Sequence, residues 1–482
     1  MSSIFFSSGL FLGWSLGANN MSNVFGTAVG TRMIRFRTAA IWCSVFVILG
    51  AVVSGAGATQ TLGKLGSVNA LAGAFMVALS SAITMFLMTK ASYPVSTSQT
   101  IVGSIVGWNL FSGSLIDYGA LTKILSTWVF CPILSAGFSM VMYIACRRFI
   151  MWRKPHMLQQ DHFTRMGLLL AGIFGSYALG ANNISTVMGV FVPISHLSPI
   201  RVFDLFTLTA AQQLFFLGGL AIAAGVFTYS KKVIMTVGGG GIMKLSPVAA
   251  FIVVVSHSLV LTIFSSQGLS NAFVSIGLPP IPLVPVSSSQ AIVGAVIGIG
   301  LLKGGRGIRW RTVGAICSSW AVTPVIAAVI CFVSLFFLQN VFMQQTYRPE
   351  SYRITDAAVE RLAPVVDVHS LEALRGQTFA SAREFKNGLD TVRAFSHEDT
   401  GRIMQACRLA PIRFTPELEN VLKKTGPLPP KDLNVLAGQN FFHRWQLEEA
   451  LQKLVQAKAE MQKNTIQKTA DVLYAAWEKT TS

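Results

Sequence analysis

The sequence predicts an all-α integral membrane protein with two inverted repeats of about five transmembrane segments each, built with broken helices, followed by a C-terminal helical soluble domain. Three observations predict this class: the composition, the positions of long apolar segments, and a set of motifs that occurs twice. The 482 residues are 52% hydrophobic and only 12% charged, and their mean hydropathy is +0.55. Soluble proteins contain about 25% charged residues. A soluble enzyme with a single core is therefore excluded.

Charge is distributed unevenly along the chain. Residues 1–340 contain 19 of the 38 Lys and Arg but only three acids, Asp117, Asp161 and Asp204. Residues 341–482 contain the other 19 bases together with 17 acids, so they are nearly neutral. The net charge of +18 lies almost entirely between apolar segments, which does not fit a nucleic-acid-binding surface. We expect the partner of the first part to be the lipid bilayer and not nucleic acid.

Ten apolar segments are long enough to cross a bilayer, which takes about 20 residues. They are predicted at residues 3–30, 39–58, 68–89, 97–113, 121–146, 166–192, 202–228, 245–264, 287–302 and 311–338. The predicted domains are a first membrane repeat at 1–146, a basic cytoplasmic linker at 147–165, a second membrane repeat at 166–338 and a C-terminal helical domain at 345–482.

The bases indicate the orientation of these segments. If all ten cross, 16 Lys and Arg lie in the odd-numbered connections and three in the even-numbered ones. The positive-inside rule then places the odd connections in the cytoplasm and both termini outside. We expect a multi-pass protein of the inner cell membrane. The segments at 68–89 and 97–113 could instead form a re-entrant hairpin, which would change the count.

Three motifs occur twice in the same order. The pairs are Gly-Ala-Asn-Asn at 17–20 and 180–183, Pro-Val-Ser-(Thr/Ser)-Ser-Gln at 94–99 and 285–290, and a Trp-to-Pro segment at 128–132 and 320–324. The offsets between copies are 163, 191 and 192 residues, so the order is kept with one insertion. An odd number of segments in each repeat forces the copies into opposite orientations, as in many secondary transporters.

The repeated motifs suit an anion site. Gly permits a helix break within lipid, where Asn can bond the freed backbone groups. The Pro-Val-Ser copies are typical of helix starts, since Pro suits the first turn and hydroxyls form caps. A helix start presents N–H donors and the positive end of its dipole to an anion. A single copy would be explained by capping alone. Two matched copies favour a small tetrahedral oxyanion held between the halves at the midplane.

These motifs resemble the two signatures of the inorganic phosphate transporter (PiT) family, and the resemblance covers roughly residues 1–338. It implies a cation-coupled importer of phosphate, or in some branches sulfate, that is not an enzyme and has no cofactor. It also implies symport with Na⁺ or a proton, and we expect alternating access. The implied substrate-binding residues are Asn19, Ser96, Thr97, Ser98, Gln99, Asn182, Ser287, Ser288, Ser289 and Gln290.

One departure from the family affects cation coupling. The family signature ends in Asp, and the resemblance assigns those carboxylates to the coupling cation, whereas this chain has Asn20 and Asn183. Asn carbonyls still suit a hard cation but lack formal charge, so coupling through carboxylates at these positions is excluded. Sulfate carries no proton and therefore needs no acceptor in the site. Asn in place of the family's Asp at positions 20 and 183 thus favours sulfate as a substrate more than the family signature does. Phosphate remains the first expectation and sulfate or another oxyanion the alternative.

Several alternatives stay open at this point. A passive anion channel or uncoupled exchanger, and a receptor that signals to the C-terminal domain, are the rival functions. His196 and His257 lie in or beside apolar segments and act either as proton relays or as hydrogen-bonded structural residues. The six Cys have no metal-ligand spacing, so no metal site is expected. Assembly into a homo-oligomer is left open.

Overall fold

The computed structural model describes residues 2–66, 68–90, 95–195, 197–202, 206–237, 242–410, 412–413 and 440–456. Contacts between residues divide the chain into two compact units. The membrane unit comprises Met1–Ser112 and Ile116–Arg348, and the C-terminal unit comprises Gly113–Leu115 and Pro349–Ser482.

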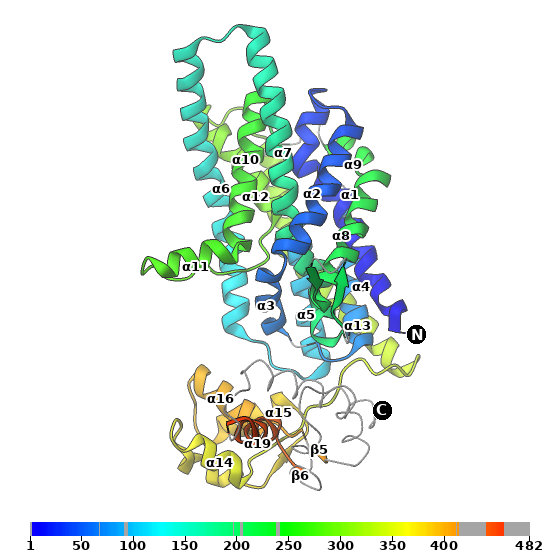
Figure 1. Ribbon diagram of the computed structural model, residues 1–482, viewed down its shortest axis with the longest axis vertical. Helices are drawn as coiled ribbons and strands as arrows, with labels where there is room; N and C mark the ends of the chain where they lie inside the picture. Colours follow the sequence, from blue (N-terminus) through cyan, green and yellow to red (C-terminus); the bar gives the residue numbers. More distant parts are fainter. Residues whose placement is uncertain are drawn as a thin grey trace. The chain divides into compact units, whose positions relative to one another are not determined.

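The membrane unit is a bundle of helices (Figure 1). Its first half contains η1 (Ser2–Phe6), α1 (Ser7–Gly30), α2 (Phe36–Ser54), α3 (Ala56–Leu65), α4 (Leu71–Lys90), α5 (Thr97–Ser112) and α6 (Tyr118–Arg153). Its second half contains α7 (Met157–Met188), η2 (Gly189–Ile194), β1 (Ile200–Val202), β2 (Phe206–Leu208), α8 (Ala210–Thr228), α9 (Ser230–Val237), α10 (Pro247–Ser265), α11 (Gln267–Ser275), α12 (Ser288–Leu302) and α13 (Trp310–Asn340).

The helices confirm the predicted fold class of a mainly helical membrane protein. A helix overlaps each of the ten predicted segments. Within the described residues, seven helices are long and apolar enough to cross a membrane: α2, α4, α6, α7, α8, α10 and α13. The remaining segments correspond to α1, which is rich in Gly, Ser and Asn, and to the shorter helices α5 and α12.

The two halves of the membrane unit interleave. Helix α1 packs along α8, and α2 packs along α7, so the first two helices of each half contact those of the other. Helix α5 packs along α13, and α12 packs along α6, which again joins the halves. The apolar core is therefore shared by both halves.

Glycines permit the closest of these contacts, and they do so in matched pairs. A Cβ at Gly17 of α1 would collide with the backbone of Ile222 in α8, and one at Gly180 of α7 would collide with Val47 in α2. Gly103 of α5 meets the backbone of Pro324 in α13 in the same way, and Gly294 of α12 meets Pro132 in α6. The Gly of the two Gly-Ala-Asn-Asn copies is thus explained by backbone contact between helices, because any side chain would separate them.

Helices α5 and α12 begin deep inside the bundle. With 16 and 15 residues they are about 24 and 22 Å long, less than the roughly 30 Å hydrocarbon core. The Sγ of Cys131, well inside α6, lies 3.6 Å from the carbonyl oxygen of Ser287, which precedes α12. Ser288 contacts His257, at the middle of α10. Helix α12 therefore starts well inside the length of α6 and beside the middle of α10.

Two segments differ in detail from the sequence-based expectation. The basic linker at 147–165 is mostly helical, because α6 continues to Arg153 and α7 begins at Met157, and the two helices form a projecting hairpin (Figure 1). The segment predicted from residue 202 begins instead with the antiparallel pair β1–β2, and α8 starts at Ala210. Thr209 and Gln212 form a capping box that fixes this start.

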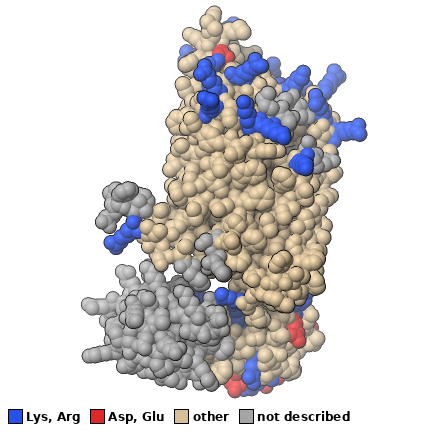
Figure 2. All heavy atoms as spheres, turned by 90° about the vertical axis from the view of Figure 1, so that its right-hand side faces the viewer, with Lys and Arg blue, Asp and Glu red and all other residues tan. Residues whose placement is uncertain are grey.

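Lys and Arg gather at one end of the membrane unit, the end where α6 and α7 meet (Figures 1 and 2). The hairpin of α6 and α7 at this end contains the exposed bases Arg147 and Arg153. They belong to the linker that the sequence assigned to the cytoplasm.

The C-terminal unit has its own small core of apolar side chains. Its described elements are β3 (Tyr352–Arg353), α14 (Asp356–Leu362), η3 (Val368–Leu374), β4 (Thr378–Phe379), α15 (Ala382–Val392), α16 (His397–Cys407), β5 (Ile412–Arg413), β6 (Asn440–Phe441) and α19 (Arg444–Gln456). The pairs β3–β4 and β5–β6 are two residues long, too short to leave an alternating pattern in the sequence.

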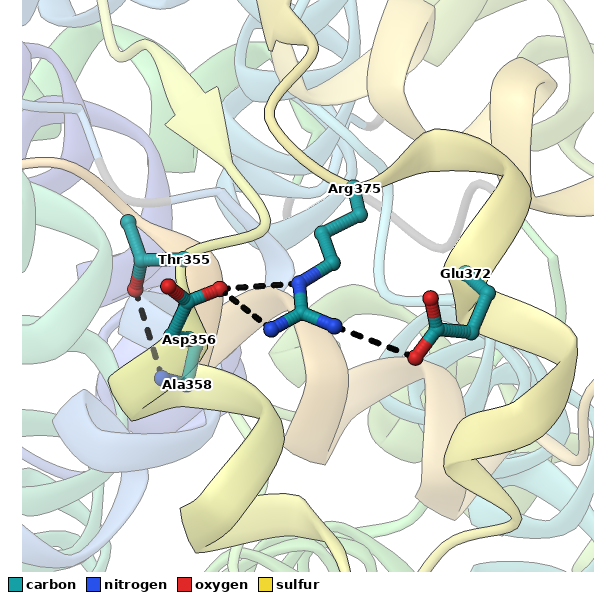
Figure 3. A network of polar contacts seen from close by, with 5 residues as sticks. All are labelled: Thr355, Asp356, Ala358, Glu372 and Arg375. Atoms are coloured by element: carbon teal, nitrogen blue, oxygen red, sulfur yellow. Dashed lines mark hydrogen bonds and ion pairs between the residues drawn. The ribbon is translucent and has the colours of Figure 1, made fainter.

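An ion-pair network joins two elements of this unit (Figure 3). The guanidinium of Arg375 bonds Asp356, at the start of α14, at 2.7 Å and Glu372, in η3, at 3.2 Å. Hydrogen bonding to Asp356 raises the pKa of Arg375. Thr355 caps α14 by accepting from the amide of Ala358 at 3.2 Å.

Candidate anion-binding site

The starts of α5 and α12 are joined by one hydrogen bond. The hydroxyl of Ser289 donates to the carbonyl oxygen of Val95 at 2.8 Å. Both residues are buried. The two Ser/Thr-rich motifs, 191 residues apart in the sequence, thus contact each other inside the membrane unit.

At the start of α5 the hydroxyls bond to one another and to neighbouring groups. Ser96 and Ser98 share a 2.8 Å hydrogen bond, and Thr97 donates to the Sδ of Met85 at 3.4 Å. The Oε1 of Gln99 is buried and has no partner among the described residues. The site therefore contains an amide oxygen that is available as an acceptor.

The start of α12 is arranged differently. Ser287 caps the helix by accepting from the amide of Gln290 at 3.2 Å. The Oγ of Ser288 accepts from Nδ2 of Asn23 at 3.0 Å and lies 2.8 Å from Nε2 of His257. The Oε1 of Gln290, like that of Gln99, is buried without a partner in the described part of the chain.

Asn182 holds the segment that leads into α12. Its Nδ2 donates to the carbonyl oxygen of Val286 at 2.8 Å, and its Oδ1 accepts from the amide of the same residue at 3.0 Å. The side chain is completely buried. The side chain of Asn182 thus bonds the amide and the carbonyl of Val286 as the backbone of a neighbouring strand would. It supplies hydrogen-bond partners that these buried backbone groups require.

The matching residue of the first half makes no such contact. Nδ2 of Asn19 donates to Oδ1 of Asn20 at 3.2 Å, and Asn19 is only partly buried. Nδ2 of Asn183 donates to the carbonyl oxygen of Leu179 at 3.1 Å, within its own helix. The two halves therefore use the same motif differently, with Asn182 fixed to the backbone and Asn19 less constrained.

Eleven of the twelve predicted site residues are buried, and Asn19 is the exception. Helices α1, α5, α10 and α12 contain no Asp or Glu. Among the described residues no group of three or more His, Cys, Asp and Glu is placed to bind a metal ion. The site is formed by helix starts, hydroxyls and amides.

Sequence reasoning missed three contributors, Asn23 and the backbone groups of Val95 and Val286. Asn23 lies four residues after Asn19, so the helical spacing could have placed it on the same face. Val95 and Val286 contribute only backbone atoms, which no side-chain pattern reveals. Pro94 and His196 lie outside the described residues.

Comparison with known proteins identifies the family. The phosphate transporter family matches residues 16–331 and 283–463. The chain belongs to this family. It is a multi-pass membrane transporter, and since the family is one of transporters, the expectation that it is not an enzyme is confirmed.

Three relatives illustrate the range of the family. A protein from Methanocaldococcus jannaschii with the provisional name phosphate permease is 30% identical over 324 residues, 67% of this chain and 93% of that protein. Inorganic phosphate transporter 2-1 of Arabidopsis thaliana is 25% identical over 426 residues, covering 67% of this chain and 70% of that protein. The sulfate permease of Bacillus subtilis is 28% identical over 348 residues, covering 68% and 86%.

A solved structure has a similar fold. A sodium-dependent phosphate transporter superposes with a TM-score of 0.54 and 22% sequence identity, covering 70% of this chain and 99% of that one.

Proposed function

We propose that this chain transports inorganic phosphate across the inner cell membrane by alternating access, with the anion held between the starts of α5 and α12. The observation that carries this proposal is the hydrogen bond from Ser289 to Val95, which joins two buried helix starts inside the membrane unit. Each start offers amides without an intrahelical acceptor and the positive end of a helix dipole.

The surrounding side chains suit a protonated oxyanion. Ser287 and one member of the Ser96–Ser98 pair have a hydroxyl proton left to donate to the oxygens of the anion. The hydroxyls of Thr97 and Ser289 instead donate to Met85 and Val95 and shape the site. The monohydrogen form of phosphate also carries one O–H group, which needs an acceptor. The unpartnered Oε1 atoms of Gln99 and Gln290 provide one without any carboxylate. Asn182 positions the segment before α12 and does not contact the anion in this arrangement.

The matched glycine contacts support two inverted repeats. Gly17 and Gly180 each meet the second helix of the opposite half, and Gly103 and Gly294 each meet its last helix. In this proposal α4–α5 and α10–α12 are re-entrant hairpins that enter from opposite sides. Movement of one half against the other would then expose the anion to each side in turn.

Sulfate is the second candidate substrate. The absence of carboxylates from α1, α5, α10 and α12 leaves a site dominated by donors, which sulfate requires. A relative named as a sulfate permease also covers 68% of this chain. For either substrate, transport would be coupled to Na⁺ or to a proton. Asn20 and Asn183 supply amide oxygens to such a cation but no negative charge.

Uptake into proteoliposomes tests the proposal. The full chain is reconstituted, and uptake of radiolabelled phosphate and sulfate is measured with and without a gradient of Na⁺ or protons. We expect phosphate to accumulate when one of the two cation gradients is present. Equilibrating flux alone would indicate an uncoupled exchanger, binding without flux would indicate a receptor, and preferential sulfate accumulation would favour the second candidate.

A further inference from the structure

A buried histidine contacts a residue of the proposed anion site. His257 lies at the middle of α10 and is completely buried. Its Nε2 lies 2.8 Å from Oγ of Ser288, while its Nδ1 has no hydrogen-bond partner among the described residues. An ionisable side chain at such depth is rare and commonly functional.

The protons at Ser288 can be arranged in two ways. A hydroxyl has one proton, and Ser288 already accepts from Asn23. If Nε2 of His257 is unprotonated, the Ser288 hydroxyl donates to the imidazole and cannot donate to the anion. If Nε2 carries a proton, it donates to Ser288, whose own proton is then free to bind the anion. The proton on Nε2 thus decides which way the Ser288 hydroxyl points. A neutral imidazole can hold its single proton on Nδ1 instead, whereas the doubly protonated ring always presents an Nε2–H to Ser288.

Among the described residues, the helices packed against α10 bring no carboxylate beside this imidazole. The helices that pack on α10 are α1, α3, α6, α7 and α12. Outside the Lys- and Arg-rich end, these helices carry the following titratable residues: Lys64 on α3, Tyr118, Lys123, Cys131, Tyr143 and Cys146 on α6, and Tyr177 on α7. The one acid on these helices, Asp161, lies in the first turns of α7 and bonds Arg165 at 3.4 Å. A doubly protonated His257 would therefore be a buried, unpaired cation, which is costly.

We propose that a proton on His257 and the anion beside Ser288 bind together, so that His257 is the residue that couples transport to protons. The inference rests on the proposed function. The anion supplies the charge that an imidazolium lacks, and the imidazolium frees the Ser288 hydroxyl for the anion. Binding of each must then strengthen binding of the other by the same factor.

The pH dependence of phosphate affinity tests this coupling. Binding of radiolabelled phosphate to the purified full chain is measured between about pH 5.5 and pH 8, where a histidine titrates. The compared proteins are wild type, His257→Gln, and the matched control His162→Gln, whose side chain is exposed at the start of α7. Because phosphate itself titrates in this range, the informative quantity is the difference in slope between proteins.

We expect wild type and His162→Gln to gain affinity on acidification by up to about tenfold per pH unit more than His257→Gln. Equal slopes in wild type and His257→Gln would overturn the coupling while leaving the proposed function intact. A wild-type protein that binds no phosphate at any pH would overturn both. His257→Asn, which also cannot carry the proton, replaces the Gln variant if that variant fails to fold by size-exclusion chromatography.

Discussion

The hydroxyl of Ser289 donates a 2.8 Å hydrogen bond to the carbonyl oxygen of Val95, and this bond joins the start of α12 to the start of α5. The two residues are 194 positions apart and come from opposite halves of the membrane unit. The bond therefore directly connects the two halves of the membrane unit at the proposed anion site.

Ser289→Ala should weaken this pairing. The buried carbonyl of Val95 loses its donor, which costs about 1–3 kcal/mol. We expect a lower thermal unfolding midpoint and slower phosphate uptake in proteoliposomes. Ser318→Ala is the control, since among the described residues that exposed hydroxyl bonds within its own helix, to the carbonyl of Gly314. A Ser289 variant with the stability and uptake of the control would contradict the role of this bond.

Asn182→Ala should be more damaging than Asn19→Ala. The first substitution removes both partners of the Val286 backbone, whereas the second removes one bond to the neighbouring Asn20. Loss of two buried partners costs about 1–3 kcal/mol each. We expect the double variant to lose phosphate binding and Asn19→Ala alone to retain part of it. Binding by the double variant at wild-type affinity would remove both Asn from the site.

Restoring carboxylates should create a Na⁺ response. In Asn20→Asp the carboxylate still accepts from Asn19. In Asn183→Asp it faces the carbonyl oxygen of Leu179, to which the amide previously donated, so two acceptors meet without a proton or cation between them. We expect Na⁺ to raise the unfolding midpoint of the double Asp variant and not that of wild type. The same response in both proteins would contradict this account of the substitutions.

The sequence predicted the parts of the site that repeat and missed those that do not. The repeated motifs identified both helix starts, because the same residues recur in the same order. The different roles of Asn19 and Asn182 could not be predicted, since identical letters make different contacts in the two halves. The link from Asn23 to Ser288 also depends on which helices interleave. Interleaving is a tertiary property that periodicity within one helix does not encode.

The C-terminal unit should lose stability in mild acid because of His443. Burial lowers the pKa of His443, and its hydrogen bond to the carbonyl of Arg408 opposes this only in part. The unfolded chain, with an ordinary pKa of 6.5, then binds the proton more readily than the folded one. Folding stability is therefore full above about pH 6.5 and falls as the pH drops below it.

We expect the acid-induced decrease in the unfolding midpoint to be smaller in His443→Gln than in wild type. The same pH series on His369→Gln, whose side chain is exposed in η3, should match wild type. An identical pH profile for wild type and the His443 variant would show that another group causes the loss. Trp445 stacks on His443 with ring centroids 5.5 Å apart, so its fluorescence is a suitable local signal.

Gly294→Ala should disrupt the contact between α12 and α6. A Cβ at this position would collide with the carbonyl of Pro132, so the helices must separate, and overpacking of this kind costs about 1–3 kcal/mol. Gly314→Ala in α13 is the matched control, because its Cβ would meet nothing within 4 Å. Ala favours a helix by up to about 1 kcal/mol over Gly, so the control should be neutral or more stable. Thermal unfolding of the two purified variants distinguishes the cases. Since α12 carries Ser288 and Ser289 at its start, its displacement should also reduce phosphate affinity. A Gly294→Ala variant with wild-type stability and affinity would show that the close approach of α12 to α6 is not needed to form the site.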